Sequence, residues 1–347
     1  MSYDAILFVS FGGPEGPDDV LPFLENVLRG RNVPRERMLE VAEHYQQFGG
    51  ISPINGQNRE LIDALRHEFE TQDLDLPIYW GNRNWHPMLV DTLKKMRDDG
   101  IQRALAFVTS AFSSYSGCRQ YREDIQKAQT EIGPGAPVID KLRMFFNHPG
   151  FVETMRDRTN DALQEISLAQ RDTARLVYTA HSIPLSMSDN CRYVEQLRES
   201  ARLVTEAVGH QEFDLVYQSR SGPPHQPWLE PDICDHLETL ASNGCQNVVI
   251  IPLGFVSDHM EVKFDLDTEA QDEAKRLEIN VVRAGTAGTH PRFVSMIREL
   301  VVERLEDASE RPALGVLGPN HDVCPEDCCL PGRTGPPSGR PSTSPGR

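Results

Sequence analysis

The chain has 347 residues, of which 39% are hydrophobic and 25% charged, and its net charge at pH 7 is −17. This length suffices for two domains, and the composition is typical of a soluble globular protein. No apolar run approaches the roughly 20 residues of a membrane-spanning helix, and the acidic balance argues against binding nucleic acid through bulk charge. The chain enters a strand-like run without a signal-type segment, so we expect a cytoplasmic protein.

Apolar runs of strand length alternate with helical patterns along most of the chain, which predicts parallel sheets covered by helices. The clearest strands are expected at 5–10, 78–81, 104–109, 176–180, 213–218 and 247–252. The helices are expected at 17–28, 58–71, 91–99, 150–166, 193–208, 231–243 and 291–305. We expect an N-terminal α/β domain over residues 1–150, a C-terminal α/β domain over 151–309 with its last helix packed back on the first domain, and a tail over 310–347.

The two parts of the chain resemble each other in three places. Residues 7–14 resemble 177–184, residues 80–83 resemble 217–220, and residues 108–114 resemble 251–257, in the same order. This predicts two similar domains that face each other across a cleft, with Phe11 opposite His181.

Two short segments follow expected strands and carry side chains that can bind a metal. His181 ends one apolar run, and the segment 257–261 follows another, at the positions where open α/β sheets bind their ligands. Glu261, Asp265 and Glu269 recur every four residues, so on a helix they would form one acidic row. Such a row is either a solvated acidic face or a path for a cation, and its start beside a histidine favours the path.

The segments 11–14, 50–54, 180–184, 218–223 and 257–261 together resemble the ferrochelatase family, and the resemblance covers about residues 5–305. The run 113–122 further resembles the actinobacterial branch. The resemblance implies two similar Rossmann-like domains with parallel four-stranded sheets and an active-site cleft between them. It also implies a lyase-class metallochelatase that inserts Fe2+ into coproporphyrin III in haem biosynthesis and releases two protons, with protoporphyrin IX as the alternative substrate.

Inserting a metal into a porphyrin requires a ligand for the cation, an acceptor for the pyrrole protons and rigid walls that bend the macrocycle. A neutral imidazole can ligate iron or accept a proton near pH 7, so His181 is the first candidate. Glu261 offers a hard oxygen ligand, expected on the opposite side of the same pocket. Which of the two holds the iron and which takes the protons stays open. The side chains expected to relay ions or to orient this pair are Asp258, His259, Asp265 and Glu269.

The porphyrin propionates need hydrogen-bond donors and positive charge. The resemblance implies porphyrin contacts by Ser52 and Tyr121. Arg29, Arg31 and Tyr45 are further candidates, although the two arginines fit a solvated loop equally well. Phe11 stands where some relatives have Tyr, so it can form an apolar wall but cannot ligate iron.

The seven cysteines do not suggest a secreted disulfide framework, because they are odd in number and mostly scattered. Three of them, Cys324, Cys328 and Cys329, lie close together in the tail. Some ferrochelatases bind a 2Fe-2S cluster through such a tail and one cysteine of the body, so the resemblance suggests a cluster here. The fourth ligand would be Cys118, Cys191, Cys234 or Cys245, with His321 as a less usual choice. We expect residues 334–347 to be disordered, since they hold almost no apolar side chain.

Three other functions remain as alternatives: a cobalt or nickel tetrapyrrole chelatase, a cleft-type ligand-binding protein, and an iron-sulfur redox protein built around the tail. The expected partners are coproporphyrin III or protoporphyrin IX, ferrous iron, and a downstream enzyme of the haem pathway. We expect a monomer with no nucleic-acid partner and no membrane insertion.

Overall fold

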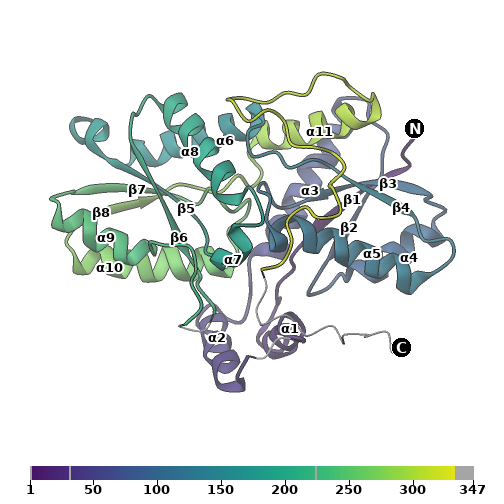
Figure 1. Cartoon of the computed structure of the whole chain (residues 1–347), viewed down its shortest axis with the longest axis horizontal. Helices are drawn as coiled ribbons and strands as arrows, with labels where there is room; N and C mark the ends of the chain where they lie inside the picture. Colours follow the sequence, from purple (N-terminus) through teal and green to yellow (C-terminus); the bar gives the residue numbers. More distant parts are fainter. Residues whose placement is uncertain (1, 31–32, 223–224, 333–347) are drawn as a thin grey trace, which may run out of the picture.

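The computed structural model describes residues 2–30, 33–222 and 225–332, and it contains two four-stranded parallel sheets (Figure 1). The first has the order β2-β1-β3-β4, with β1 (Ala5–Ser10), β2 (Ile78–Asn82), β3 (Arg103–Val108) and β4 (Val138–Lys141). The second has the order β6-β5-β7-β8, with β5 (Arg175–His181), β6 (Phe213–Gln218), β7 (Asn247–Ile251) and β8 (Asn280–Arg283). The same order in both sheets confirms the predicted α/β fold with two similar parts, here called the N-terminal half and the C-terminal half.

Helices cover both sheets, which is why the central strands are almost wholly apolar. Every residue of β1 and of β7 is buried, as expected for parallel strands packed on both faces. The helices of the N-terminal half are α1 (Val20–Val27), α2 (Arg35–Gln47), α3 (Ile54–Thr71), α4 (Leu89–Asp98) and α5 (Gln120–Ile132). Those of the C-terminal half are α6 (Pro149–Gln164), α7 (Leu185–Ser188), α8 (Tyr193–Val208), α9 (Ile233–Ser242), α10 (Ala270–Arg276) and α11 (Pro291–Leu305).

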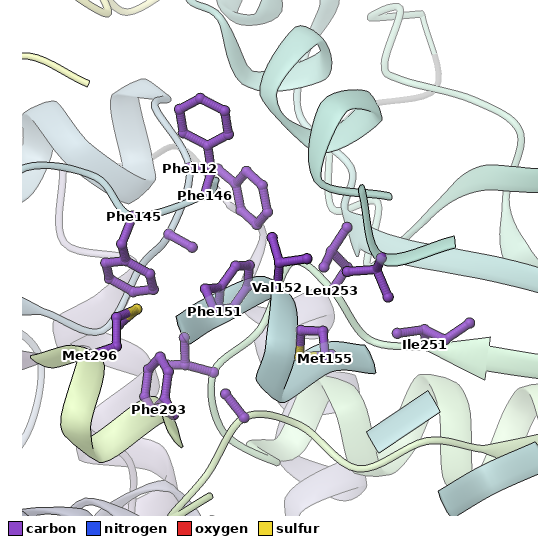
Figure 2. Close-up of a cluster of buried hydrophobic side chains, with 14 of the residues drawn as sticks. Phe112, Phe145, Phe146, Phe151, Val152, Met155, Ile251, Leu253, Phe293 and Met296 are labelled. Atoms are coloured by element: carbon purple, nitrogen blue, oxygen red, sulfur yellow. The ribbon is translucent and has the colours of Figure 1, made fainter. Parts of the chain in front are cut away.

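The two halves share one hydrophobic cluster. It contains Phe8 of β1 and Ile251 of β7, so it reaches from one sheet to the other. Figure 2 shows its middle, where Phe145, Phe151 and Phe293 pack edge to face or tilted at centroid distances of 5.6 to 6.4 Å. Because protein cores are close-packed and resist deformation, this shared core holds the two halves in a fixed relation.

The last helix crosses back to the N-terminal half. α11 packs against both α3 and α6, and Arg298 of α11 pairs with Glu68 of α3 at 2.9 Å (Figure 1). The expected domain boundary between residues 150 and 151 falls at the start of α6 and stays a prediction.

Residues 310–332 have no regular secondary structure and run along both halves, as the yellow trace of Figure 1 shows. In the C-terminal half, the Val316 N–H donates to Glu199 of α8 at 2.9 Å. In the N-terminal half, Arg119 donates to the carbonyl oxygens of Glu326 and Cys328. Residues 334–347, which we expect to be disordered, lie outside the described residues.

α1 and α2 project from the lower side of the molecule in Figure 1. A small cluster of their own holds them together, with Phe23 and Leu24 of α1 against Met38 and Ala42 of α2. Among the helices of the described residues, none combines the length and the apolar character that crossing a membrane would take.

Candidate active site

The end of β5 and the segment after β7 bring His181 and Glu261 together. His181 is the last residue of β5, and Glu261 immediately precedes a π-helix, Val262–Glu269, that follows β7. Because β5 and β7 are neighbours in one parallel sheet, their carboxyl ends share an edge. The Nε2 atom of His181 lies 3.5 Å from Oε1 of Glu261. The prediction that these side chains face each other from opposite sides of the pocket is therefore wrong, since both belong to the C-terminal half.

This geometry suits two ligands of one metal ion. Bonds of about 2.1 Å to a first-row metal place a nitrogen and an oxygen ligand about 3 to 3.5 Å apart. The side chain of His181 is 33% exposed and that of Glu261 is 47% exposed, so a ligand can reach both. The Nδ1 atom of His181 faces the carbonyl oxygen of Ser182 at 2.5 Å, which leaves Nε2 as the nitrogen directed at Glu261.

The pair is charged when no cation is bound. Burial alone would lower the pKa of His181, but the Glu261 carboxylate outweighs it and raises this pKa to about 9. Burial likewise opposes ionisation of Glu261, and the His181 imidazolium outweighs it, so the pKa of Glu261 falls to about 2. An entering cation therefore competes with the proton on His181.

Two residues before Glu261, a second histidine approaches the same carboxylate. His259 Nε2 lies 3.7 Å from Oε2 of Glu261, and its ring packs edge-on against Phe255 at 4.9 Å. Burial lowers the pKa of His259, so this imidazole is neutral beside the charged pair. Asp258 pairs with Arg283 at 3.0 Å, and this fixes the start of the segment. The structure thus places His259 beside the Glu261 carboxylate, whereas Asp258 anchors the backbone of the same segment.

The acidic row lies on the π-helix rather than on an α-helix. Asp265 accepts hydrogen bonds from Ser219 and from the Gln218 amide, the latter at 3.3 Å. Burial raises the pKa of Asp265 to about 7, against the Ser219 hydrogen bond and with the help of the neighbouring carboxylates Glu261 and Glu269. Glu269 is exposed at the far end, where burial and then Asp232 raise its pKa. Asp265 can therefore take up or release a proton near neutral pH.

The N-terminal half contributes aromatic and cationic groups. Phe11, directly after β1, is 36% exposed and packs edge-on against Phe23 at 6.3 Å. The guanidinium of Arg83 lies 5.7 Å from the ring centroid of Phe11 and 4.4 Å from that of Tyr121. Arg83 is 5% exposed and pairs with Asp124 at 2.5 Å. We did not predict a role for Arg83, although it lies at the strand end that resembles residues 217–220.

The residues expected to contact the porphyrin differ in exposure. Ser52 is 4% exposed and Tyr121 5% exposed, and burial raises the pKa of Tyr121. Tyr45 of α2 is half-buried, and burial together with the nearby Glu261 raises its pKa above the usual value. Arg29 is exposed just after α1. Arg31 lies outside the described residues.

The N-terminal half also closes directly onto the segment that carries Glu261. His44 of α2 stacks on Phe264 of the π-helix, with ring centroids 3.8 Å apart and planes 11° from parallel. The side-chain oxygen of Gln57 in α3 accepts the Asp258 N–H at 2.8 Å. Neither contact was predicted, because no local pattern relates residues 44 and 57 to residues 258–264.

Cys118 is the cysteine that joins the three in the tail. It is 2% exposed on a second π-helix, Tyr115–Arg119, and the thiols of Cys324 and Cys329 hydrogen-bond to its sulfur, which lowers its pKa. The sulfurs of Cys328 and Cys329 are 3.5 Å apart. His321, Cys324 and Cys328 place their ligand atoms within 4.8 Å of one another. Four thiols and one imidazole therefore converge. Cys191 lies near them, but its thiol donates to the carbonyl oxygens of Met187 and Ser188. Cys234 lies on α9 and Cys245 just before β7.

Comparisons with known proteins agree with this architecture. A family model described as Ferrochelatase matches residues 3–305. A ferrochelatase from Rhodopirellula baltica is 60% identical over 342 residues, which cover 98% of this chain and 97% of the relative. A coproporphyrin III ferrochelatase from Streptomyces coelicolor is 52% identical over 365 residues, covering 99% and 97%.

Among solved structures, SirB from Bacillus subtilis with Fe3+ is similar in fold. Its TM-score is 0.53 at 15% identity, over 87% of this chain and 97% of that chain. The predicted resemblance is confirmed by the family match and by the relatives, which extend over nearly the whole sequence. The chain belongs to the ferrochelatase family.

Proposed function

We propose that this ferrochelatase inserts Fe2+ into coproporphyrin III in haem biosynthesis and releases two protons. The observation that carries the proposal is the accessible His181–Glu261 pair, with 3.5 Å between Nε2 and Oε1, at the carboxyl edge of a parallel sheet. The choice of porphyrin is supported by relatives named coproporphyrin III ferrochelatase from Streptomyces coelicolor and Nocardia farcinica, which are 52% and 49% identical to this chain.

Glu261 receives the iron. Its carboxylate is ionised, half-exposed and next to Asp265 and Glu269, so a cation is attracted along this acidic row. A cation on Glu261 cancels the attraction that raises the pKa of His181. The imidazole then loses its proton, and its Nε2 lone pair becomes available.

His181 then accepts the pyrrole protons, one after the other. A neutral imidazole whose Nδ1 is held by the Ser182 carbonyl presents Nε2 as a base of fixed orientation. Asp265, with a pKa of about 7, takes each proton in turn, and the exposed Glu269 passes it to solvent. Iron keeps its oxidation state, so two protons and one cation balance the exchange.

The porphyrin lies against the rim of the N-terminal half, where Phe11 is a partly exposed apolar side chain at a strand end. Ser52, Tyr121, Tyr45 and Arg29 remain our candidates for contacts with the porphyrin and its propionates. Buried Arg83 supports this wall through the rings of Phe11 and Tyr121.

Turnover of purified protein tests the substrate assignment. Under anaerobic conditions we expect Fe2+ insertion into coproporphyrin III with at least a tenfold higher kcat/KM than into protoporphyrin IX, the second candidate. The reverse preference would contradict the choice of porphyrin. A strong preference for Co2+ or Ni2+ over Fe2+ would instead favour the chelatase alternative.

We also propose that Cys118, Cys324, Cys328 and Cys329 hold a 2Fe-2S cluster. The donor set fits, because four thiols meet there, two of them on buried residues, and the sulfur of Cys118 is already biased towards thiolate. The cluster would supply one-electron chemistry when bound, which metal insertion does not use. Its ligands come from the π-helix Tyr115–Arg119 and from the tail, so its role is to join these two segments.

The cluster is tested by absorption and electron paramagnetic resonance spectra and by iron and sulfide analysis of protein isolated without oxygen. We expect about two irons and two sulfides per chain. Cys118→Ser should lose the signal, whereas Cys234→Ser should keep it. Retention of the full signal in Cys118→Ser would exclude Cys118 as a ligand.

We further propose that the protein works as a cytoplasmic monomer and passes its product to a later enzyme of the haem pathway. Light scattering of the purified protein tests the proposed monomer, and the mass of a dimer at micromolar concentration would contradict it.

A further inference from the structure

Gln218 is a buried residue at the end of β6. It contacts the backbone of Ser182, next to His181, and the backbone of Glu261. It is 1% exposed, and its side-chain amide donates to the backbone carbonyl of Glu261 at 3.2 Å and to Oδ2 of Asp265 at 3.3 Å. Its own backbone carbonyl accepts the N–H of Ser182 at 2.8 Å. In the sheet, Gln218 is the register partner of His181.

The two bonds of the amide nitrogen both reach the start of an unusual helix, one at its backbone and one at a carboxylate. The segment Val262–Glu269 is a π-helix, a rare geometry with i→i+5 hydrogen bonds that is frequent at functional sites. Glu261 directly precedes this helix, and a carbonyl oxygen with two lone pairs can accept a second hydrogen bond beside an intrahelical one. The Gln218 amide supplies such a second donor to the carbonyl of Glu261.

The side-chain amide of Gln218 acts as a hydrogen-bond donor. Its oxygen, Oε1, has no hydrogen-bond partner within the part of the chain that the structure describes. The side chain is therefore held by its two donor bonds, and a leucine or a glutamate of similar size could not make them. Ser219, the next residue, also donates to Asp265.

The contacts of Gln218 connect His181 to Glu261. The Ser182 N–H is fixed by Gln218, and the Ser182 carbonyl faces Nδ1 of His181. On the other side, Gln218 fixes the backbone of Glu261. We propose that Gln218 is a positioning residue that sets the separation of His181 from Glu261 and thereby the affinity of Glu261 for the entering iron. The inference rests on the proposed function, in which Glu261 receives the iron beside His181.

Steady-state kinetics of Gln218→Leu and of the isosteric Gln218→Glu test the inference. We expect kcat/KM for Fe2+ to fall about tenfold in each variant, because both donor bonds of the amide are lost. The loss should lie mainly in the KM for Fe2+, with the KM for the porphyrin and its fluorescence-monitored binding unchanged. A purely structural role would lower the folded fraction without separating the two KM values.

Gln129→Leu is the matched control. Gln129 also donates its amide to a backbone carbonyl, that of Pro137 at 2.8 Å, but on α5 and away from the pair. This control should lose some thermal stability and keep the wild-type KM for Fe2+. Wild-type KM and kcat in both Gln218 variants would overturn the inference, as would equal changes of both KM values. If instead Glu261→Gln retains wild-type turnover, the proposed function itself fails, and the two failures are thus distinguishable.

Discussion

The two halves repeat one sheet order, yet equivalent strand ends do different work. Asn82 ends β2, and its side chain is satisfied inside the N-terminal half by Asn55, His86 and Trp80. Gln218 ends β6 and donates to the segment that carries Glu261 and Asp265. The repeated fold therefore supplies two similar sheet edges. The hydrogen bonds of Asn82 stay within the N-terminal half, whereas those of Gln218 reach the candidate active site.

The two halves also differ at the ends of the neighbouring strands, β1 and β5. Phe11 follows β1 and His181 ends β5, so an apolar ring in one half takes the place of an imidazole in the other. The metal chemistry that we propose belongs to the C-terminal half, and the N-terminal half supplies cover through α2, α3 and the strand end of β1. Each variant below tests how complete this division is.

The largest effect is expected from His181→Ala. We expect kcat for iron insertion to fall by at least a hundredfold, because the variant lacks the proposed base, while porphyrin binding stays measurable. Phe11→Leu, at the matching place in the other half, should change kcat by less than about threefold, since it keeps an apolar wall. Comparable losses in both variants would break the proposed division of roles.

Glu261→Gln should be next in size. It keeps the shape of the side chain and removes the charge that attracts Fe2+ and raises the pKa of His181. At limiting Fe2+ we expect insertion to slow by about a hundredfold, with part of the loss recovered at saturating iron. Unchanged turnover at limiting iron would contradict a metal role for this carboxylate.

The pH dependence of iron uptake tests the same interaction between Glu261 and His181. The pKa of His181 is raised to about 9, so the imidazole carries a proton below that pH and Fe2+ must displace it. The KM for Fe2+ should therefore fall as the pH rises from 6.5 to 8.5, measured without oxygen. In Glu261→Gln the pKa of His181 should drop towards its usual value, and the fall in KM should occur at lower pH. A KM that is constant over this range would contradict the competition.

The smallest effect concerns stability and compares two helix starts. His148 is the N-cap of α6 and His290 is the N-cap of α11. In each, the Nδ1 atom accepts the backbone N–H of the residue two positions later, at 3.1 and 3.3 Å. Burial, followed by the nearby charges of Arg143 and Arg292, lowers the pKa of His148 to about 3, although Glu299 lies 3.6 Å away. Burial also lowers the pKa of His290, but this side chain is more exposed, at 18% against 1%.

A lowered pKa in the folded state means that the unfolded chain binds more protons. Stability from His148 is therefore complete above pH 6.5 and is lost as the pH falls towards 3, by about 2 kcal/mol at pH 5. His148→Asn, which keeps a capping acceptor, should remove this loss, as measured by urea unfolding at pH 7.5 and 5. His290→Asn should have a smaller effect. Equal pH dependence of the wild type and His148→Asn would contradict the assignment.

Most of the central fold could be predicted from the sequence, because buried parallel strands are continuous apolar runs. β1, β6, α8 and α11 begin and end where their patterns do. β4 and β8 were missed because each has only four residues and a polar end. Edge strands bury less, and so their sequences carry less signal.

The sequence could predict which residues the candidate site brings together, but not how they are arranged. The motifs placed His181 and Glu261 near one sheet edge, but the strand order β6-β5-β7-β8 decides that they are neighbours on one wall. Spacing by four residues is also compatible with an α-helix, so it could not reveal the π-helix. The fourth thiol was left open among four cysteines, because the path of the tail past Cys118 depends on contacts more than 200 residues apart in sequence.

The return of α11 to the start of the chain has a consequence for synthesis. Arg304 reaches the hydroxyl of Tyr3 at 3.1 Å, across 301 residues of sequence, and α11 covers apolar side chains of α3. When the first half leaves the ribosome, its covering helix has not yet been made. Pairings of such long range slow folding and leave apolar surface open to aggregation in the meantime. We therefore expect nascent chains that stop before residue 291 to be held by chaperones rather than to fold.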